Sequence, residues 1–334
     1  MKNVTINDVA HEANVSKSTV SHYLNGHFTK MGPDTRDRIA RAVRNLDYSP
    51  NHIAKSLKNK RTMTIGVIVA NILHNFSTRV IRSIEDFAHG HGYHVIVCNT
   101  DNSPEKEADY IRMLLAKQVD GLVVIPTAQN GALFTELAEK DYPVVFVDRY
   151  IENVPIQSHM LDNGASVRTA FEHLSERGHR EIGFLTEPVE GIVARQERYA
   201  AYRGLCASYG IRPLPIQVEK EGMVSSLEQL ADQGGLPASL IVANDLALFE
   251  LLKMAKQRVI LIPDDLSIIS IDDIEFADFF NPGITVIAQP AVEIGTAAVS
   301  ALFEMMNNSK NTSGIERFQP YLIERESVKQ YEDQ

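Results

Sequence analysis

The sequence predicts an α/β protein with a small N-terminal helical domain and a larger body of two doubly wound parallel sheets. Its 334 residues exceed what one typical core holds, so two or three domains are expected. Apolar residues recur at helical spacing through the first 50 residues. From Thr64 onward, short aliphatic runs alternate with amphipathic segments, and this alternation restarts after Asp162. Such alternation is typical of parallel sheets covered by helices.

Composition and charge exclude some classes of protein. No run approaches 18 apolar residues, so a membrane span is not expected. The first eight residues lack the apolar core of a signal peptide, and we therefore expect a cytoplasmic protein. Cys98 and Cys206 lie in apolar runs and are expected as buried free thiols. Residues 1–61 carry 11 basic and 5 acidic residues, whereas the remainder carries 22 and 38, which indicates that only the head meets a polyanion.

Three helices are predicted in the basic head. Thr5 and Asp8 fit a capping box at the start of the first helix. After a short break at residues 14–16, Ser16 is a suitable N-cap for a second helix over residues 17–24. Pro33 lies in the first turn of the third.

The second helix is short and carries a polar outer side. Two short helices joined by a brief turn match the helix-turn-helix motif, whose second helix enters the DNA major groove. Its hydroxyl, imidazole and cationic groups could read base edges there. Periodicity alone leaves open a plain three-helix bundle with solvated polar faces. The outward side chains are those of Lys17, Ser18, Ser21 and His22.

The head resembles that of lactose/galactose-repressor (LacI/GalR) regulators, through residues 4–10, 15–21 and 24–25 and through 46–51 with Ala54 and Leu57. Within that family, residues 17–19 and 22–26 are most similar to regulators of ketogluconate and hexuronate use. The resemblance implies base reading by Lys17, Ser18 and His22. His22 departs from the usual arginine and donates fewer hydrogen bonds to a base. The DNA-binding residues implied, including those for caps and phosphates, are Thr5, Ser16, Lys17, Ser18, Thr19, Ser21, His22, Asn25, Tyr48, Asn51, Ala54, Lys55, Leu57 and Lys58.

A hinge is predicted between head and body. Residues 50–58 fit a helix of two turns, below the roughly 12 residues that an isolated helix needs. The resemblance implies that two such hinges pack together in the minor groove, with Leu57 wedged between base pairs. The alternative is that Leu57 anchors the linker to the body. Lys55, Lys58, Lys60 and Arg61 would face phosphates, so affinity should fall steeply with salt.

The body is predicted as two lobes with a ligand cleft between them. Near-continuous aliphatic runs predict strands at 64–70, 94–99, 122–125 and 144–147, then at 182–185, 240–243, 267–271 and 285–287. Ligands of such sheets bind beyond the carboxyl ends of the strands. The expected divisions are a head at 1–48, a hinge at 49–61, an N-terminal lobe at 62–160 with 290–318, and a C-terminal lobe at 161–289 with 319–334.

Residues 178–183, 242–245, 262–267 and 272–273 also resemble this family and, beyond it, the periplasmic sugar-binding proteins. Ser270 and Phe249 depart from the family pattern near the expected cleft. Asp, Asn and Arg around a cleft suit a polyol, although each alone could be a cap or a surface ion pair. Asn244, for example, could simply cap a helix. The predicted effector contacts are Asn75, Phe76, Ser77, Asp148, Arg149, Arg195, Asn244, Asp272 and Gln289.

The arginines favour an acidic effector. Arg149 and Arg195 together could bind a carboxylate in bidentate fashion. The chain has no tryptophan to stack on a neutral sugar. Both observations favour a sugar acid such as 2-keto-3-deoxygluconate.

Catalytic and cofactor motifs are missing from the sequence. It holds no P-loop, Gly-x-Gly-x-x-Gly, His-Glu-x-x-His or clustered Cys/His set, so no enzyme, cofactor or metal is expected. His89, His91 and His94 fit a solvated turn better than a metal site. The expected protein is a homodimeric repressor of a carbohydrate-utilisation operon that binds palindromic operator DNA, with effector closing the lobes. The alternative is a sugar-binding protein of the periplasmic class that does not regulate DNA.

Overall fold

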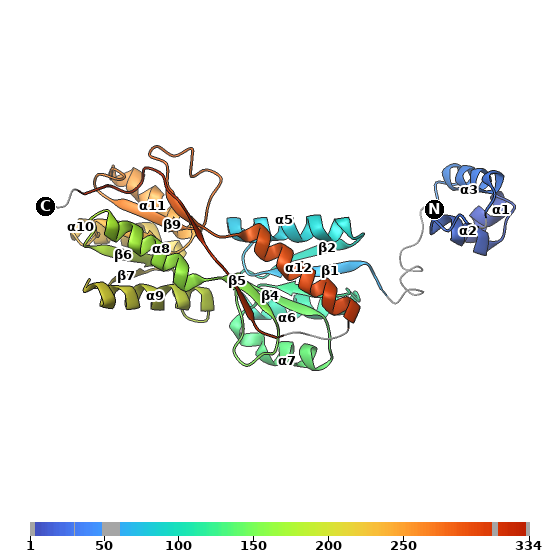
Figure 1. Ribbon diagram of the computed structural model, residues 1–334, viewed down its shortest axis with the longest axis horizontal. Helices are drawn as coiled ribbons and strands as arrows, with labels where there is room; N and C mark the ends of the chain where they lie inside the picture. The colour runs from blue at the N-terminus through green and yellow to red at the C-terminus, as the bar shows by residue number, and fades with distance from the viewer. Residues whose placement is uncertain (1–3, 30, 49–60, 309–312, 332–334) are drawn as a thin grey trace. The chain divides into compact units, whose positions relative to one another are not determined.

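A computed structural model describes residues 4–29, 31–48, 61–308 and 313–331 (Figure 1). The chain forms two compact units, Met1–Thr62 and Met63–Gln334. Five residues predicted to bind DNA lie outside the described residues, and they are Asn51, Ala54, Lys55, Leu57 and Lys58.

The first unit contains the three predicted helices, α1 (Ile6–Glu12), α2 (Lys17–Leu24) and α3 (Pro33–Asn45). The capping box is present at α1, where the Asp8 carboxylate accepts from the backbone N–H of Thr5 at 2.7 Å. Each helix contributes an apolar face to one small core, which includes the fully buried Val9, Val20 and Ile39.

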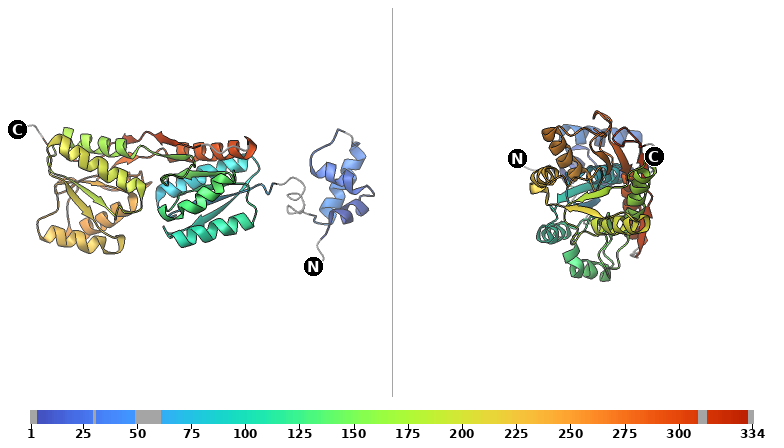
Figure 2. Two further views of the ribbon diagram at one scale, coloured as in Figure 1. Left: turned by 90° about the horizontal axis from the view of Figure 1, so that it is seen from below. Right: turned by 90° about the vertical axis from the view of Figure 1, so that its left-hand side faces the viewer.

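The N-terminal lobe of the second unit has a sheet in the order β11-β5-β4-β3-β1-β2. Three of its inner strands, β1, β3 and β4, are almost wholly apolar, because helices cover both faces, whereas the inner strand β5 also carries Ser158 and His159 (Figure 2). Helices α5 and α12 pack on one face, and α6 and α7 pack on the other. The elements are β1 (Thr64–Val69), α5 (Asn75–Gly90), β2 (His94–Asn99), α6 (Pro104–Ala116), β3 (Leu122–Val124), η1 (Ala128–Asn130), α7 (Gly131–Glu139), β4 (Val144–Val147), β5 (Ser158–Leu161), α12 (Ala291–Asn308) and β11 (Ile315–Phe318).

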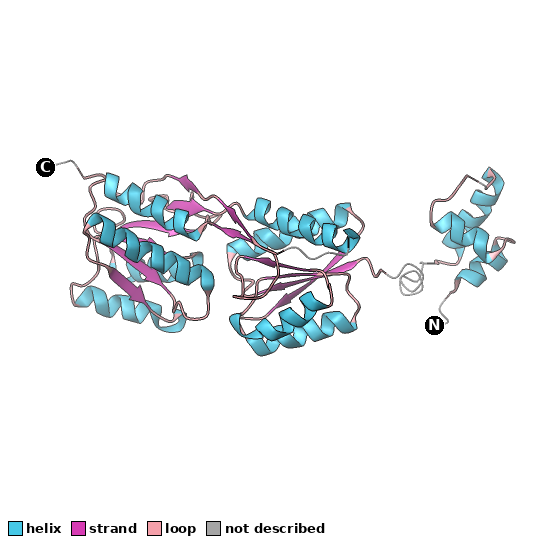
Figure 3. Cartoon of the chain, turned by 60° about the horizontal axis from the view of Figure 1, so that its bottom comes forward, coloured by secondary structure: helices cyan, strands magenta, loops and turns pink. Residues whose placement is uncertain are grey.

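The C-terminal lobe repeats this plan with a sheet in the order β12-β10-β9-β8-β6-β7 (Figure 3). Helices α8 and α9 cover one face, and α10 and α11 cover the other. The elements are α8 (Asn163–Glu176), β6 (Ile182–Thr186), α9 (Val193–Tyr209), β7 (Leu214–Gln217), η2 (Lys220–Gly222), α10 (Met223–Asp232), β8 (Ser239–Val242), α11 (Asp245–Arg258), β9 (Ser267–Ile271), β10 (Thr285–Ala288) and β12 (Tyr321–Ile323).

Sequence analysis overlooked four strands, β5, β7, β11 and β12. Strands β7, β11 and β12 lie at the edges of their sheets, where exposed residues interrupt the aliphatic pattern, and β7 contains Pro215. One expectation was also incomplete, because β12 pairs antiparallel with β10 in an otherwise parallel sheet. The chain passes between the lobes after β5, after β10 and between β11 and β12, so residues 319–320 form one of three crossings.

Close packing of α12 against α5 gives the first testable prediction. A Cβ added at Gly295 would lie 2.0 Å from the Ser83 hydroxyl and 3.0 Å from the backbone oxygen of Val80. Gly295→Ala should therefore destabilise the body by about 1–3 kcal/mol in denaturant unfolding, because a backbone atom cannot move aside cheaply. Gly204→Ala is the matched control, since its Cβ meets nothing within 4 Å on helix α9. Equal stability of the two variants would contradict this account of the packing.

Candidate functional site

Helix α2 and its N-cap carry several polar side chains, and these divide into two kinds. Ser16 caps the helix, because its hydroxyl accepts from the backbone N–H of Thr19 at 3.2 Å. The Ser16 hydroxyl also lies 2.8 Å from the hydroxyls of Ser18 and Thr19. Lys17 and His22 are exposed and are not used in this capping. The side chains of Lys17 and His22 are thus available to contact a base or a phosphate.

The far end of α2 adds one residue that sequence analysis overlooked. The rings of His22 and His27 lie edge to face with centroids 6.1 Å apart, and both residues are exposed. The Asn25 amide donates to the backbone oxygen of Ser21 at 2.8 Å and so closes the helix end. Tyr48 packs partly buried against the core of this unit, and burial raises the pKa of its hydroxyl. Asn25 and Tyr48 thus have structural roles alongside the predicted contact with DNA.

A cavity lies between the two lobes of the second unit, beyond the carboxyl ends of their strands. Every predicted effector contact except Asn75 lines it. Each lobe supplies part of the wall, so a bound molecule would touch both. The predicted residues in the wall are Phe76, Ser77, Asp148, Arg149, Arg195, Asn244, Asp272 and Gln289, and the additional ones are Ala70, Asn71, His74, Ile125, Ile192, Ala194 and Arg198.

Two arginines of this wall come from opposite lobes. Arg149 is buried and donates to the Asn102 side chain at 2.9 Å. Arg195 donates to the backbone oxygen of Pro188 at 3.1 Å and pairs with Glu187. Burial lowers the pKa of Arg149, the charge of the paired Asp148 opposes that shift, and the charge of Arg195 adds to it. An anion bound near both guanidinium groups would offset the repulsion between them.

The acidic side of the wall is centred on Asp272. Burial raises the pKa of Asp272 to about 6, the charge of Asp245 adds to the rise, and the Arg198 guanidinium opposes it. The Gln289 amide donates to the Asp272 carboxylate. The Gln289 carbonyl oxygen is buried and accepts no hydrogen bond from the described part of the chain. Asp272 and Gln289 thus offer acceptors to the hydroxyl groups of a ligand.

Arg198 is the most important wall residue that sequence analysis overlooked. It is 4% exposed, and it donates from Nε to the Asn163 side chain at 2.8 Å and from Nη1 to the backbone oxygen of Ala243 at 2.6 Å. Its Nη2 makes no hydrogen bond to another described residue. The sequence does carry a signal for it, because Arg195 and Arg198 are three residues apart and so share one face of α9.

Asn75 lies at a contact between the lobes and is not among the residues that line the cavity. Its backbone N–H donates to the Asp245 carboxylate at 2.7 Å, and its side chain donates to the backbone oxygen of Asp273 at 2.5 Å. His74 lies beside it, with Nδ1 2.5 Å from the Asp245 carboxylate. Burial lowers the pKa of His74, but the hydrogen bond and charge of Asp245 outweigh burial and place that pKa above its usual value. We call His74, Asn75, Asp245 and Asp273 together the interlobe clasp.

Asn244 caps a helix, as considered, and also lines the cavity. Its side-chain oxygen accepts from the backbone N–H of Ala247 at 2.9 Å and so caps α11, while its amide donates to Glu187 at 3.0 Å within the cavity wall. Ser270 is buried in strand β9 and does not line the cavity.

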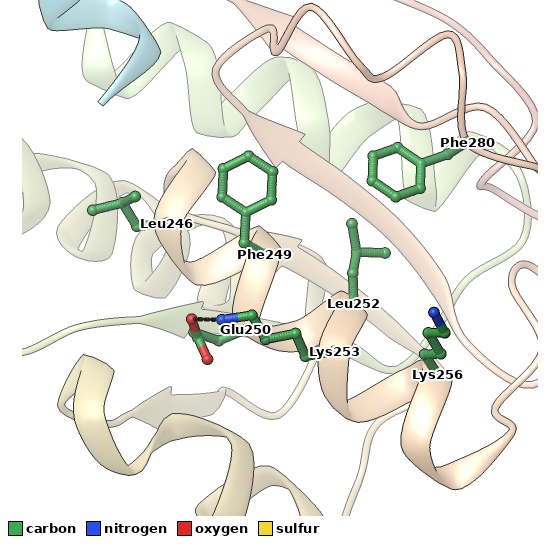
Figure 4. Close-up of a pocket in the computed structure, with 7 residues that line it drawn as sticks. All are labelled: Leu246, Phe249, Glu250, Leu252, Lys253, Lys256 and Phe280. Carbon is green, nitrogen blue, oxygen red and sulfur yellow. Dashed lines mark hydrogen bonds and ion pairs between the residues drawn. The ribbon is translucent and has the colours of Figure 1, made fainter. Parts of the chain in front are cut away.

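A second hollow, of about 420 Å³, lies over helix α11 and is mostly apolar (Figure 4). The residues that line it include the apolar Phe249, Leu252 and Phe280 and the basic Lys253 and Lys256. Phe249 was expected near the effector cleft, and the structure places it in this separate hollow. Nearby in the chain, Phe279 is 83% exposed, which is unusual for so large an apolar side chain.

None of the described helices is long and apolar enough to cross a membrane. No group of three His, Cys, Asp or Glu residues in the described ranges is placed to hold a metal ion.

Known proteins resemble both units. Residues 5–51 match the family model "Bacterial regulatory proteins, lacI family", and residues 171–328 match a periplasmic binding protein-like domain. The probable HTH-type transcriptional regulator EndR of Paenibacillus polymyxa is 38% identical over 97% of this chain and 98% of its own length. The regulator KdgR of Bacillus subtilis is 31% identical over 97% of both. A crystal structure of the Lac repressor dimer bound to operator and the anti-inducer ONPF is similar with a TM-score of 0.86 and 25% identity, covering 98% of this chain and all of that one.

Proposed function

Because this chain belongs to the LacI family of bacterial regulatory proteins, we propose that it represses a carbohydrate-utilisation operon and that a sugar acid controls it. It is a DNA-binding transcriptional regulator with a sugar-binding type of body, and its relatives are regulators and not enzymes. The observation that carries the proposal is the cavity between the lobes, with arginines from both sides and carboxylate and amide acceptors between them.

The arginine pair supports an acidic effector. Arg149 and Arg195 bring two positive charges to the cavity wall from opposite lobes, each beside one carboxylate, Asp148 or Glu187, and an effector carboxylate would accept charge-assisted hydrogen bonds from both. Asp272, Gln289 and Asn244 would then bind the hydroxyl groups of the same molecule. This combination of one anionic end and several hydroxyls describes a sugar acid, and 2-keto-3-deoxygluconate is the compound we favour.

The exposed side of α2 supports the proposal for DNA. Lys17 and His22 are solvent-exposed at the helix that would enter the major groove, and Ser18 follows Lys17 in the first turn. Neutral histidine at position 22 would donate a single hydrogen bond to a base where arginine donates two. Thr5, Ser16, Thr19 and Asn25 would cap the helices and position them on phosphates.

We propose further that a second copy of the chain covers the hollow over α11. Phe249 and Phe280 line the hollow, and the exposed Phe276 and Phe279 extend the apolar surface. The related Lac repressor structure is a dimer, and twofold pairing suits a palindromic operator. Phe249→Glu should therefore yield a monomer in analytical ultracentrifugation, because it buries a charge in an apolar interface. Tyr209→Glu, a substitution at an aromatic residue 47% exposed on α9, is the matched control and should remain dimeric. A dimeric Phe249→Glu variant would contradict this assignment.

One experiment tests the whole proposal. The purified protein would be titrated onto its own upstream DNA with 2-keto-3-deoxygluconate, gluconate, glucuronate or a neutral hexose present. We expect a salt-sensitive, sequence-specific complex that one sugar acid alone dissociates. Specific binding that no sugar changes would remove the effector and keep the regulator. Sugar binding without any specific DNA complex would instead favour a non-regulating sugar-binding protein.

A further inference from the structure

The buried Arg198 is held by a chain of polar contacts that leads out of the cavity. Its Nε donates to the Asn163 side-chain oxygen at 2.8 Å, and the Asn163 amide donates to the Glu197 carboxylate at 2.8 Å. Arg317 donates to both oxygens of that carboxylate, at 2.6 and 3.0 Å. Asn163 is fully buried, so these partners satisfy groups that water does not reach.

This chain of contacts crosses from one lobe to the other. Arg317 lies on β11, which pairs with β5 in the sheet of the N-terminal lobe. Glu197 and Arg198 are neighbours on α9, which packs on the sheet of the C-terminal lobe. Both β5 and β11 are directly followed by crossings between the lobes. Because Arg317 and Glu197 belong to different lobes, a rotation of one lobe against the other would change the geometry of their pair.

Bidentate pairing makes this contact sensitive to geometry. A guanidinium and a carboxylate joined by two hydrogen bonds fix both their separation and their relative orientation. The Glu197 carboxylate in turn fixes the Asn163 amide, and the amide oxygen, together with the Ala243 backbone oxygen, fixes the plane of the Arg198 guanidinium. The Arg198 Nη2 is the group left to bind a ligand in the cavity.

We infer that Glu197 and Arg317 form a positioning pair that couples the orientation of Arg198 to the arrangement of the two lobes at their crossings. This inference rests on the proposed function, because it assigns to the same cavity a means of regulation. Effector bound to Arg198 stabilises the lobe arrangement in which the pair is intact. By the same linkage, loss of the Glu197–Arg317 pair lowers the affinity for effector, although neither residue contacts the effector.

The first measurement needs no effector. The carboxyl carbon of Asp272 would be titrated by NMR in the full-length protein, in Glu197→Ala and in Arg317→Met, with the signal assigned through Asp272→Asn. Removal of the Glu197 charge alone would lower the pKa of Asp272. Release of Arg198 from its position near Asp272 would raise that pKa instead, by about one unit. Loss of the Glu197 charge and release of Arg198 thus predict shifts of opposite sign in the pKa of Asp272 for Glu197→Ala.

The second measurement is the affinity for sugar acid in the same proteins. We expect losses of about tenfold in Glu197→Ala and in Arg317→Met, with no larger loss when the two are combined, since either change breaks the same contact. Arg258→Met is the matched control, because Arg258 makes a similar two-bonded pair with Asp232 in the C-terminal lobe alone. Arg258→Met should change neither the pKa of Asp272 nor the affinity for sugar acid.

The outcomes separate this inference from the proposed function. A lowered pKa of Asp272 in Glu197→Ala overturns the positioning pair, as do additive losses of affinity in the double variant. If the wild-type protein binds no sugar acid, the proposed effector is wrong, and the titration of Asp272 still decides the positioning pair. If Arg317→Met does not fold, Arg317→Lys, which retains the charge and loses the second hydrogen bond, takes its place with the same criteria.

Discussion

Replacement of Arg198 by methionine should abolish the effector response while operator binding without effector stays within about twofold of wild type. The guanidinium is buried in the cavity wall and its Nη2 is left for a ligand, so the variant loses a charge-assisted hydrogen bond. Such a bond contributes about 1.5–3 kcal/mol, which corresponds to roughly a 10- to 150-fold loss of effector affinity. Calorimetry with the sugar acid and operator binding with and without it would measure both quantities.

The choice of control matters, because a buried arginine also supports its surroundings. Arg177→Met removes a C-lobe arginine that pairs with Glu324 and does not line the cavity. It should leave effector affinity unchanged. Thermal unfolding of both variants would show whether either loses the fold. Full effector affinity in a folded Arg198→Met protein would show that this arginine does not bind the ligand.

Interlobe contacts explain why the sequence predicted the cavity better than its surroundings. Strand ends can be found in a sequence, because buried aliphatic runs stop there, and residues such as Asp148, Asn244 and Asp272 follow directly. Asn75 also follows a strand, but its backbone N–H and its amide are taken by Asp245 and Asp273 of the other lobe. No local pattern reveals such a partner 170 residues away.

Sequence analysis missed the edge strands and the pairs between distant residues for a related reason. Strand β11 reads Ile-Glu-Arg-Phe, and nothing local distinguishes it from an exposed loop until β5 pairs with it. Arg317 therefore had no visible role in the sequence, although it holds the carboxylate that adjoins Arg198. The apolar alternation that predicted two lobes depends on burial on both faces, and the strands at the sheet edges lack that burial.

Residues of the cavity wall are directly followed in the sequence by residues of the interlobe clasp, and this connects ligand binding to the lobe arrangement. Asn244 and Asp272 line the cavity, whereas the next residue of each pair, Asp245 and Asp273, contacts the N-terminal lobe at His74 or Asn75. A ligand that moves Asn244 or Asp272 therefore moves the clasp with it. The His74–Asp245 pair is strongest while His74 is protonated, so it weakens as pH rises through the raised pKa of that imidazole.

Effector affinity should fall as the pH falls below about 6. Asp272 accepts hydroxyl hydrogen bonds as a carboxylate, and its pKa of about 6 means that it is increasingly protonated below that pH. If the ligand requires the ionised form of Asp272, this carboxyl contributes no change in affinity well above pH 6 and a decline of up to about tenfold for each pH unit below it. The carboxylate of a sugar acid stays ionised between pH 5 and 7, so calorimetry in that interval reports on the protein.

Two variants separate the contributions to this pH profile. Asp272→Asn should bind weakly at every pH and lose the decline below pH 6, because the titrating group is gone. His74→Gln should keep that decline and lose only the change at higher pH, where the wild-type clasp loses its charge. The two pH effects have opposite signs, because protonation of Asp272 weakens ligand binding, whereas protonation of His74 strengthens the interlobe clasp. A wild-type profile that stays flat from pH 5 to 7 would mean that the Asp272 carboxylate does not accept hydrogen bonds from the effector, and Arg198 and Asn244 would then carry the polar recognition in that part of the cavity.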